Sequence, residues 1–223
     1  MKLLHVATAR TIWLFTLLDL NPRGQAFTQQ TIDKISERYK FKGPPTITTA
    51  LEAQKKNEPI YFAAGEFMSK SGVSVVVDLK VYNDGFLADC RSSTRDSEMF
   101  LADLFSWLPA GLGLPKTEVP IRKTMYVSEL QVESKDLLTL INPKLATLRK
   151  SLAALVPKGT ATSYEVASLA FATDPKDGTP LINFKFERLI NTPFAEHRYY
   201  SSAPVHTDEH LELLENLEEI LTG

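Results

Sequence analysis

The chain of 223 residues is similar to itself at one fixed offset of 113 residues. The offset aligns two early apolar segments and two late amphipathic segments, which lie far apart in the chain. The early pairs are Val6, Arg10, Thr11, Ile12, Trp13, Leu14 and Leu17 with Val119, Lys123, Thr124, Met125, Tyr126, Val127 and Leu130. The late pairs are Thr94, Asp96, Phe100, Leu101, Asp103, Leu104, Trp107 and Leu108 with Thr207, Glu209, Leu213, Leu214, Asn216, Leu217, Ile220 and Leu221. The pattern predicts an internally duplicated α+β protein.

Each half, 1–113 and 114–223, is expected to contain one strand, a helix, an antiparallel meander and a closing helix. Because each half alone exposes a sheet edge and an apolar helix face, we expect the halves to merge into one globular body around a pseudo-twofold axis. In the first half, strands are expected at 3–18, 46–53, 60–68, 73–82 and 86–92, and helices at 29–41 and 95–108. In the second half, strands are expected at 117–133, 162–172, 180–190 and 194–202, and helices at 143–156 and 208–221.

The clearest local pattern is a hairpin over 73–92. Apolar residues alternate with other residues from Val73 to Val81, which is typical of a strand with one face on a core. Asn83, Asp84 and Gly85 then favour a tight turn.

This order of elements resembles that of the TATA-binding-protein-like fold. The resemblance implies one curved sheet with helices on its convex side, a saddle. No motif residue is shared, so no DNA-contacting position is carried over. A minor-groove saddle also needs clustered Lys and Arg, whereas the formal net charge is -2.

Composition favours a soluble globular protein, with 43% hydrophobic and 23% charged residues. The one cysteine excludes an intrachain disulfide and fits a cytoplasmic protein. His5 and Arg10 interrupt the apolar start, and its uninterrupted part from Ile12 to Leu18 is too short to span a membrane. We therefore expect a buried strand there, rather than a secretion signal, and no membrane association.

A candidate anion site lies where the helix expected at 95–108 begins. Arg91, Ser93, Thr94 and Arg95 offer guanidinium groups and hydroxyls beside free helix amides, a combination that holds phosphates and carboxylates. The alternative is an ordinary helix cap by Ser93 or Thr94.

Three histidines are weak candidates for a metal site. His206 and His210 are four residues apart, and His197 precedes them on an expected strand. Their order differs from the HExxH motif, and helix starts favour neighbouring polar residues for capping alone. We expect neither a metal nor another cofactor.

A partner surface is suggested by two patterns. The last helix is acidic with no basic residue, so Glu212, Glu215 and Glu219 would suit a basic partner or a second copy in a homodimer. Tyr82 and Val76 are expected on the outer face of the strand at 73–82.

Three functional hypotheses follow. The first is a non-catalytic binding or assembly protein that presents a sheet face or a groove between the halves to a macromolecular partner. The second is an enzyme or binder acting on a small anionic ligand, with Arg10 beside the candidate anion site and His5 as an acid or base. The third, single-stranded nucleic-acid binding, rests on aromatic and basic residues of two expected neighbouring strands, although the alternation favours a core role for both phenylalanines. These residues are Phe184, Lys185, Phe186, Arg188, His197, Arg198, Tyr199 and Tyr200.

Overall fold

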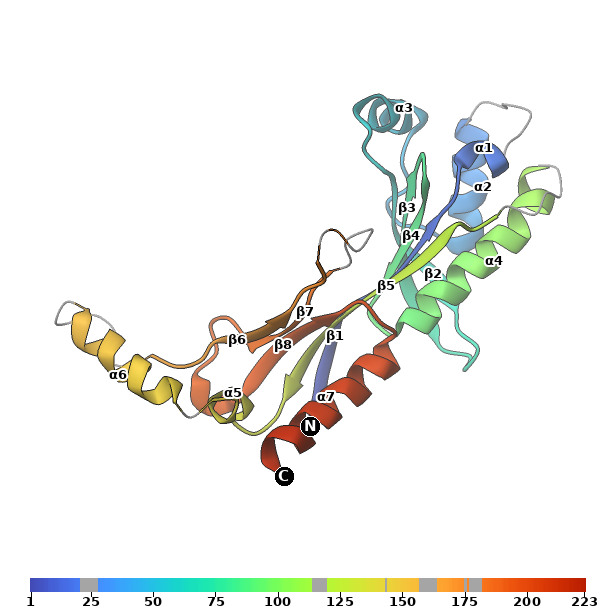
Figure 1. Cartoon of the computed structure of the whole chain (residues 1–223). Helices are drawn as coiled ribbons and strands as arrows, with labels where there is room; N and C mark the ends of the chain where they lie inside the picture. Colours follow the sequence, from blue (N-terminus) through green and yellow to red (C-terminus); the bar gives the residue numbers. More distant parts are fainter. Residues whose placement is uncertain (21–27, 114–119, 143, 157–163, 175, 177–181) are drawn as a thin grey trace. The chain divides into compact units, whose positions relative to one another are not determined.

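The structure is a computed structural model that describes residues 1–20, 28–113, 120–142, 144–156, 164–174, 176 and 182–223. It is a mixed helix and sheet protein, as expected for an α+β chain, and its eight strands form an antiparallel sheet of order β2-β3-β4-β1-β5-β8-β7-β6 (Figure 1). The chain separates into two compact units. Unit 1 comprises residues 1–5, 129–204 and 208–223, and unit 2 comprises residues 6–128 and 205–207.

Unit 2 contains most of β1 (Lys2–Leu14) and the start of β5 (Lys123–Glu133). Between them lie α1 (Leu17–Leu20), α2 (Gln29–Tyr39), α3 (Ile47–Lys56), β2 (Ile60–Met68), β3 (Ser74–Tyr82), β4 (Gly85–Cys90) and α4 (Thr94–Leu112). The hairpin expected over 73–92 is therefore confirmed as β3 and β4, which pair in register from Val77 opposite Cys90 to Tyr82 opposite Gly85.

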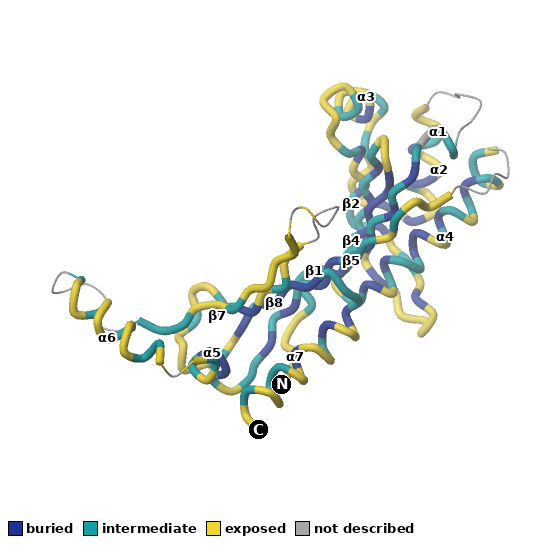
Figure 2. The backbone as a smooth tube through the Cα atoms, in the orientation of Figure 1, coloured by how far each residue is buried: buried dark blue, intermediate teal, exposed yellow. Residues whose placement is uncertain are grey.

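One face of the unit 2 sheet carries the hydrophobic core. Strand β3 places Val75, Val77, Leu79 and Val81 on this buried side. Helices α2 and α4 pack on the same side, where their buried residues join one cluster with those of the strands (Figures 1 and 2). The helix members are Ile32, Ile35 and Tyr39 of α2 and Phe100, Leu101, Leu104 and Leu108 of α4.

The outer edge of β2 is interrupted by a bulge. The register with β3 shifts between Phe62 and Gly65, and Ala64 adopts a left-handed backbone with φ of 53°. Here Gly43 pairs with Ala63, and the two residues exchange backbone hydrogen bonds of 3.2 and 3.1 Å. The segment around Gly43 therefore covers the middle of this edge.

Unit 1 contains the rest of β5, then α5 (Leu137–Leu140), α6 (Leu145–Leu155), β6 (Ser168–Phe171), β7 (Phe184–Arg188), the 3-10 helix η2 (Phe194–Glu196), β8 (Arg198–Ala203) and α7 (Thr207–Thr222). The rings of Phe186 and Tyr199 stack with their centroids 4.5 Å apart. The His210 ring of α7 lies edge-on to the Phe184 ring, with 6.3 Å between the two centroids. Helix α7 therefore covers part of the face that carries these rings, and Lys185 points to the opposite, exposed face, as the alternation predicts.

One expected strand is wrong. Residues 46–53 were expected to be extended because Ile47, Thr48 and Thr49 favour strands, yet they begin helix α3. Thr46 and Thr49 exchange side-chain and backbone hydrogen bonds in a capping box, and the following Leu-Glu-Ala-Gln-Lys-Lys segment consists of good helix formers.

Other expected boundaries need smaller corrections. Strand β1 ends at Leu14 rather than at 18, because Asp19 bonds back to Thr16 as α1 begins. Helix α4 continues past Pro109 to Leu112, beyond the expected end at 108. Helix α5 and η2 were not expected. The expected positions 117–119, 143, 162–163 and 180–181 lie outside the described residues.

Candidate interaction surface

The face of the unit 2 sheet opposite α2 and α4 follows from strand alternation. Because Val75 to Val81 point to the core at every second position, Val76, Lys80 and Tyr82 point the other way. Pairing registers carry this face across four strands, since Lys80 lies opposite both Tyr61 and Leu87, and Leu87 lies opposite Ile12. We call this surface the open face. Its uncharged members are Ile12, Leu14, Tyr61, Met68, Val76, Tyr82 and Leu87.

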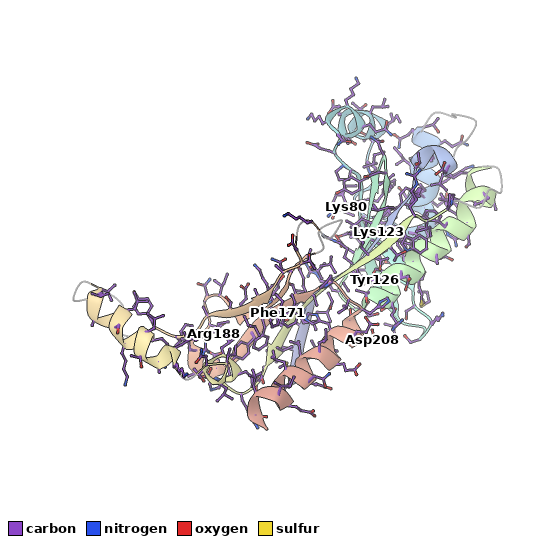
Figure 3. The ribbon with its side chains drawn as sticks, in the orientation of Figure 1. Lys80, Lys123, Tyr126, Phe171, Arg188 and Asp208 are labelled. Atoms are coloured by element: carbon purple, nitrogen blue, oxygen red, sulfur yellow. The ribbon has the colours of Figure 1, made fainter. Side chains whose placement is uncertain are left out.

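The open face exposes large apolar groups on its outer two strands. Tyr61 and Met68 of β2 and Val76 of β3 are all exposed, whereas Tyr82 is half-buried and Leu87 is buried. Lys80 lies over the ring of Tyr61, with its ammonium 5.7 Å from the ring centroid (Figure 3). Burial, followed by the nearby charge of Asp78, raises the pKa of Tyr61.

The charged groups of the open face are internally paired. Arg10 donates two hydrogen bonds to Asp89, of 2.6 and 2.9 Å, and Lys80 approaches the same carboxylate at 3.4 Å. Asp78 accepts a hydrogen bond of 2.7 Å from the backbone amide of Ala64, at the bulge of β2. These pairs leave aromatic and aliphatic groups as the main features of the surface.

The residues of the candidate anion site have several internal contacts. Ser93 is the N-cap of α4, where its hydroxyl accepts from the amide of Asp96 and donates to the Asp96 carboxylate. Thr94 is buried, while Arg91 and Arg95 are exposed. An anion at this place would meet the two arginines rather than the hydroxyls, so anion binding stays a prediction.

Thr94 and Thr207 form a reciprocal pair at the first residues of α4 and α7. The amide of Thr94 donates to the hydroxyl of Thr207 at 3.0 Å, and the amide of Thr207 donates to the hydroxyl of Thr94 at 2.9 Å. Both residues are buried, so each hydroxyl satisfies a helix amide that would otherwise lack a partner. The contact uses two positions that are 113 residues apart.

The three candidate metal histidines have different surroundings. His197 follows η2 with a left-handed backbone (φ of 49°) and precedes β8, so it does not lie on a strand, contrary to the expectation. His206 lies near Thr94, with 3.1 Å between Nδ1 and the threonine hydroxyl, and stacks on Tyr126 at 3.8 Å. His210 is buried with its Nε2 at 2.9 Å from the Ser201 hydroxyl. In the described part of the chain, no three His, Cys, Asp or Glu residues are grouped as metal ligands would be.

The expected partner residues lie on two elements. Tyr82 belongs to the open face, whereas Glu212, Glu215 and Glu219 are exposed on α7. Cys90 is a core residue, whose Sγ lies 3.2 Å from the Ser93 carbonyl oxygen and 3.6 Å from that of Ala9.

The sequence pattern placed Arg188 among the basic residues of a nucleic-acid surface, whereas the structure buries it. Its guanidinium donates to Asp136 at 2.6 Å and to the carbonyl of Val166 at 3.1 Å, and lies 4.4 Å from the centre of the Phe194 ring (Figure 3). The signal was available, because Arg188 shares the alternation of Phe184 and Phe186 and so points to their apolar face. These contacts fix the loops around β7 and β8.

No protein-family model matches the chain, and no curated protein matches it either. Among the helices of the described segments, none has the length and apolar character needed to cross a membrane.

Proposed function

We propose that this chain is a non-catalytic binding or assembly protein that presents the open face of unit 2 to a macromolecular partner. The observation that carries the proposal is the exposure of Tyr61, Met68 and Val76 on two neighbouring strands, opposite the face that α2 and α4 cover. Aromatic residues and methionine are enriched in interfaces, and adjoining exposed apolar groups are typical of interaction sites.

The charges of the open face favour a protein partner over a nucleic acid. Asp89 neutralises Arg10 and lies beside Lys80, so these bases are not presented as a row for phosphates. Binding to nucleic acid depends on unneutralised Lys and Arg. The paired charges lie between apolar groups on either side, with Tyr61 and Tyr82 at one end of the open face and Val76 and Met68 at the other. Neutralised charges flanked by exposed apolar groups suit a protein surface better than a phosphate backbone.

The same fold also supports our proposal that the two halves arose by duplication and are related by a pseudo-twofold axis, as the order of elements in the TATA-binding-protein-like fold suggests. The first four strands lie in the order β2-β3-β4-β1, and the last four lie in the order β5-β8-β7-β6. When β1, β2, β3 and β4 are matched to β5, β6, β7 and β8, the second order is the reverse of the first. The reciprocal hydrogen bonds of Thr94 and Thr207 join positions exactly one offset apart.

A binding experiment with matched variants tests the proposed function. Purified wild-type protein is used to capture partners from its source cells, and an identified partner is then titrated in pure form by calorimetry. The double substitution Tyr61→Ser with Val76→Lys places polar groups on the open face, and we expect it to weaken binding at least tenfold. The control is Leu51→Lys, which changes an exposed leucine on α3.

Both variants should keep the circular dichroism spectrum and the melting temperature of the wild-type protein, because the changed side chains are exposed. Equal affinity of the wild-type and open-face variants for the purified partner would contradict a role for the open face.

A further inference from the structure

Helix α6 has an apolar stripe that remains exposed. Leu148 and Leu152 are 64% and 43% exposed, and Leu155 continues the same side of the helix. No residue of α6 is buried in the described part of unit 1. Because leucines at helical spacing normally face a core, their exposure is an unmet packing requirement.

Helix α6 is also short. It has 11 residues, and although the Asn142 side chain accepts a hydrogen bond of 3.0 Å from the Lys144 amide at its start, the Lys144 side chain makes no capping hydrogen bond. A helix of this length is marginal in water and normally depends on packing of its apolar side. A partner surface that buries the leucines would supply this packing.

Helix α7 has a complementary uncovered stripe. Leu213 and Ile220, which are two turns apart on one side of the helix, are 45% and 78% exposed. The adjacent side of α7 is already used, since His210 and Leu214 are buried. Unit 1 therefore exposes two apolar helix surfaces of similar length.

Unit 2 shows how such surfaces pack together. At the offset of 113, Leu145, Leu148 and Leu152 of α6 correspond to Ile32, Ile35 and Tyr39, which are the buried residues of α2. Leu213 and Ile220 of α7 likewise correspond to Phe100 and Trp107 of α4. In unit 2 these two helices pack on each other: the rings of Tyr39 and Phe100 are 4.9 Å apart, and Arg38 lies 5.1 Å from the Trp107 ring.

Charge favours the same pairing in unit 1. On α2 and α4 the contact is closed by an ion pair of 2.9 Å between Arg38 and Asp103. Helix α6 carries Arg149 and Lys150 and no acidic residue, whereas α7 carries six acidic residues and no basic one. The basic helix and the acidic helix would attract each other at close range.

We propose that α6 packs on α7 of a second copy of this chain, and that two copies exchange their α6 helices reciprocally. The inference uses the duplicated architecture proposed above as its template. Within one chain both stripes stay exposed, and Arg149 of α6 forms an ion pair with Glu165, in the segment before β6. A reciprocal exchange gives a closed twofold dimer in which both stripes of both chains are buried.

The first test measures the mass of the protein in solution. Size-exclusion chromatography with light scattering, over a hundredfold range of concentration, should show the wild-type chain as a dimer. The double substitution Leu148→Glu with Leu152→Glu should raise the dissociation constant at least a hundredfold. The matched control, Thr147→Glu with Ala154→Glu, adds the same charge at exposed positions outside the leucine stripe and should remain dimeric. A wild-type chain that is monomeric throughout the range would overturn the proposal.

The second test identifies the helices in contact. One chain carries Leu152→Cys, another carries Leu213→Cys, and the two are co-expressed and oxidised, with the buried Cys90 unchanged in both. The residues of unit 2 that correspond to Leu152 and Leu213 are Tyr39 and Phe100, whose rings are in contact. We therefore expect a disulfide-linked dimer that contains one chain of each kind. Replacing Leu152→Cys by Lys150→Cys, on the other side of α6, should abolish the link.

A chain that carries both Leu152→Cys and Leu213→Cys distinguishes packing of α6 on a second copy from packing of α6 on α7 of its own chain. Exchange predicts linked dimers of this variant, whereas an internal disulfide that leaves it monomeric would overturn the role of the second copy. All substitutions lie in unit 1, so these outcomes are distinguishable from failure of the open face, which lies in unit 2. Circular dichroism of each variant shows whether it is folded before its mass is interpreted.

Discussion

The buried guanidinium of Arg188 illustrates how a charge becomes part of a core. Its side chain is 5% exposed, and its charge is balanced by Asp136, which is partly open to water. Tyr199, whose ring lies 5.8 Å from the guanidinium, donates a hydrogen bond from its hydroxyl to the carbonyl of Lys135. Burial raises the pKa of Tyr199 even though the positive charge of Arg188 opposes that change.

Replacing this arginine should be costly. We expect Arg188→Met to lower the free energy of unfolding by about 2–3 kcal/mol, because it leaves Asp136 and the carbonyls of Val166 and Phe194 without their donor. The control Arg198→Met removes an exposed ion pair with Glu196 and should cost less than about 1 kcal/mol. Denaturant unfolding of the three proteins measures both values, and equal costs would show that Arg188 is not a core contact.

Single residues were predictable from the sequence where alternation decides their surroundings. Alternation with Phe86 and Ala88 predicts a core position for Cys90, and the structure places it there on the same side of β4. Thr94 was predicted to bind an anion, whereas in the structure it pairs with Thr207. The two residues are 113 positions apart, and the local sequence pattern carries no information on such a distant contact. His210 likewise pairs with Ser201, a contact that sequence spacing alone does not reveal.

The first residues of α4 and α7 are tied by the reciprocal pair of Thr94 and Thr207. Thr94→Val and Thr207→Val should each destabilise the protein by about 1–3 kcal/mol, because each leaves a buried amide of the other helix unsatisfied. The double variant should cost less than the sum of the two, with a coupling of at least about 0.5 kcal/mol. Thermal or denaturant unfolding gives all three values, and strict additivity would contradict a direct contact.

Thr124→Val is the control for this cycle, since Thr124 is exposed on β5. We expect it to change the free energy of unfolding by less than about 0.5 kcal/mol.

Helices and strands with a regular apolar spacing were predicted well. Helix α3, which is identified mainly by its capping residues, and the short helix α5 were not. The hairpin of β3 and β4 and the helices α2, α4 and α7 follow directly from apolar spacing. Helix α3 was mistaken for a strand because its first residues are β-branched, while its capping box consists of two threonines rather than the usual Ser/Thr and Glu pair. Short α5 has too few residues for any period to be visible.

At the scale of the whole molecule, two strands belong to both units. Strand β1 has residues 2–5 in unit 1 and the rest in unit 2, and β5 changes unit after Ser128. Because separate unfolding of one unit would break these strands in the middle, we expect a single cooperative transition.

Two probes can test this cooperativity. Both tryptophans, Trp13 and Trp107, lie in unit 2, so their fluorescence reports that unit, while far-ultraviolet circular dichroism reports the whole chain. The two melting curves should coincide within about 1 °C, since two-state unfolding looks the same to every probe. Separate midpoints would show that the shared strands do not couple the units.

The expected division at residue 113 rests on the repeat alone, and the compact units cross it because β1 and β5 contribute to both. Sequence similarity identifies which elements correspond, but which strands become neighbours is decided by long-range pairing that leaves no local pattern. For the same reason the open face could be anticipated only at Tyr82 and Val76, and its members from β1, β2 and β4 required the registers.

The bulge of β2, closed by Gly43, has a consequence for the chain in a crowded solution. A straight terminal strand would offer its unpaired amides and carbonyls to any other extended peptide and could seed fibrils. Here the backbone amide and carbonyl of Ala63 are already bonded to Gly43, and the left-handed backbone at Ala64 interrupts the row of unpaired amides and carbonyls along the strand. Growth of a continuous ladder from this border is thereby blocked.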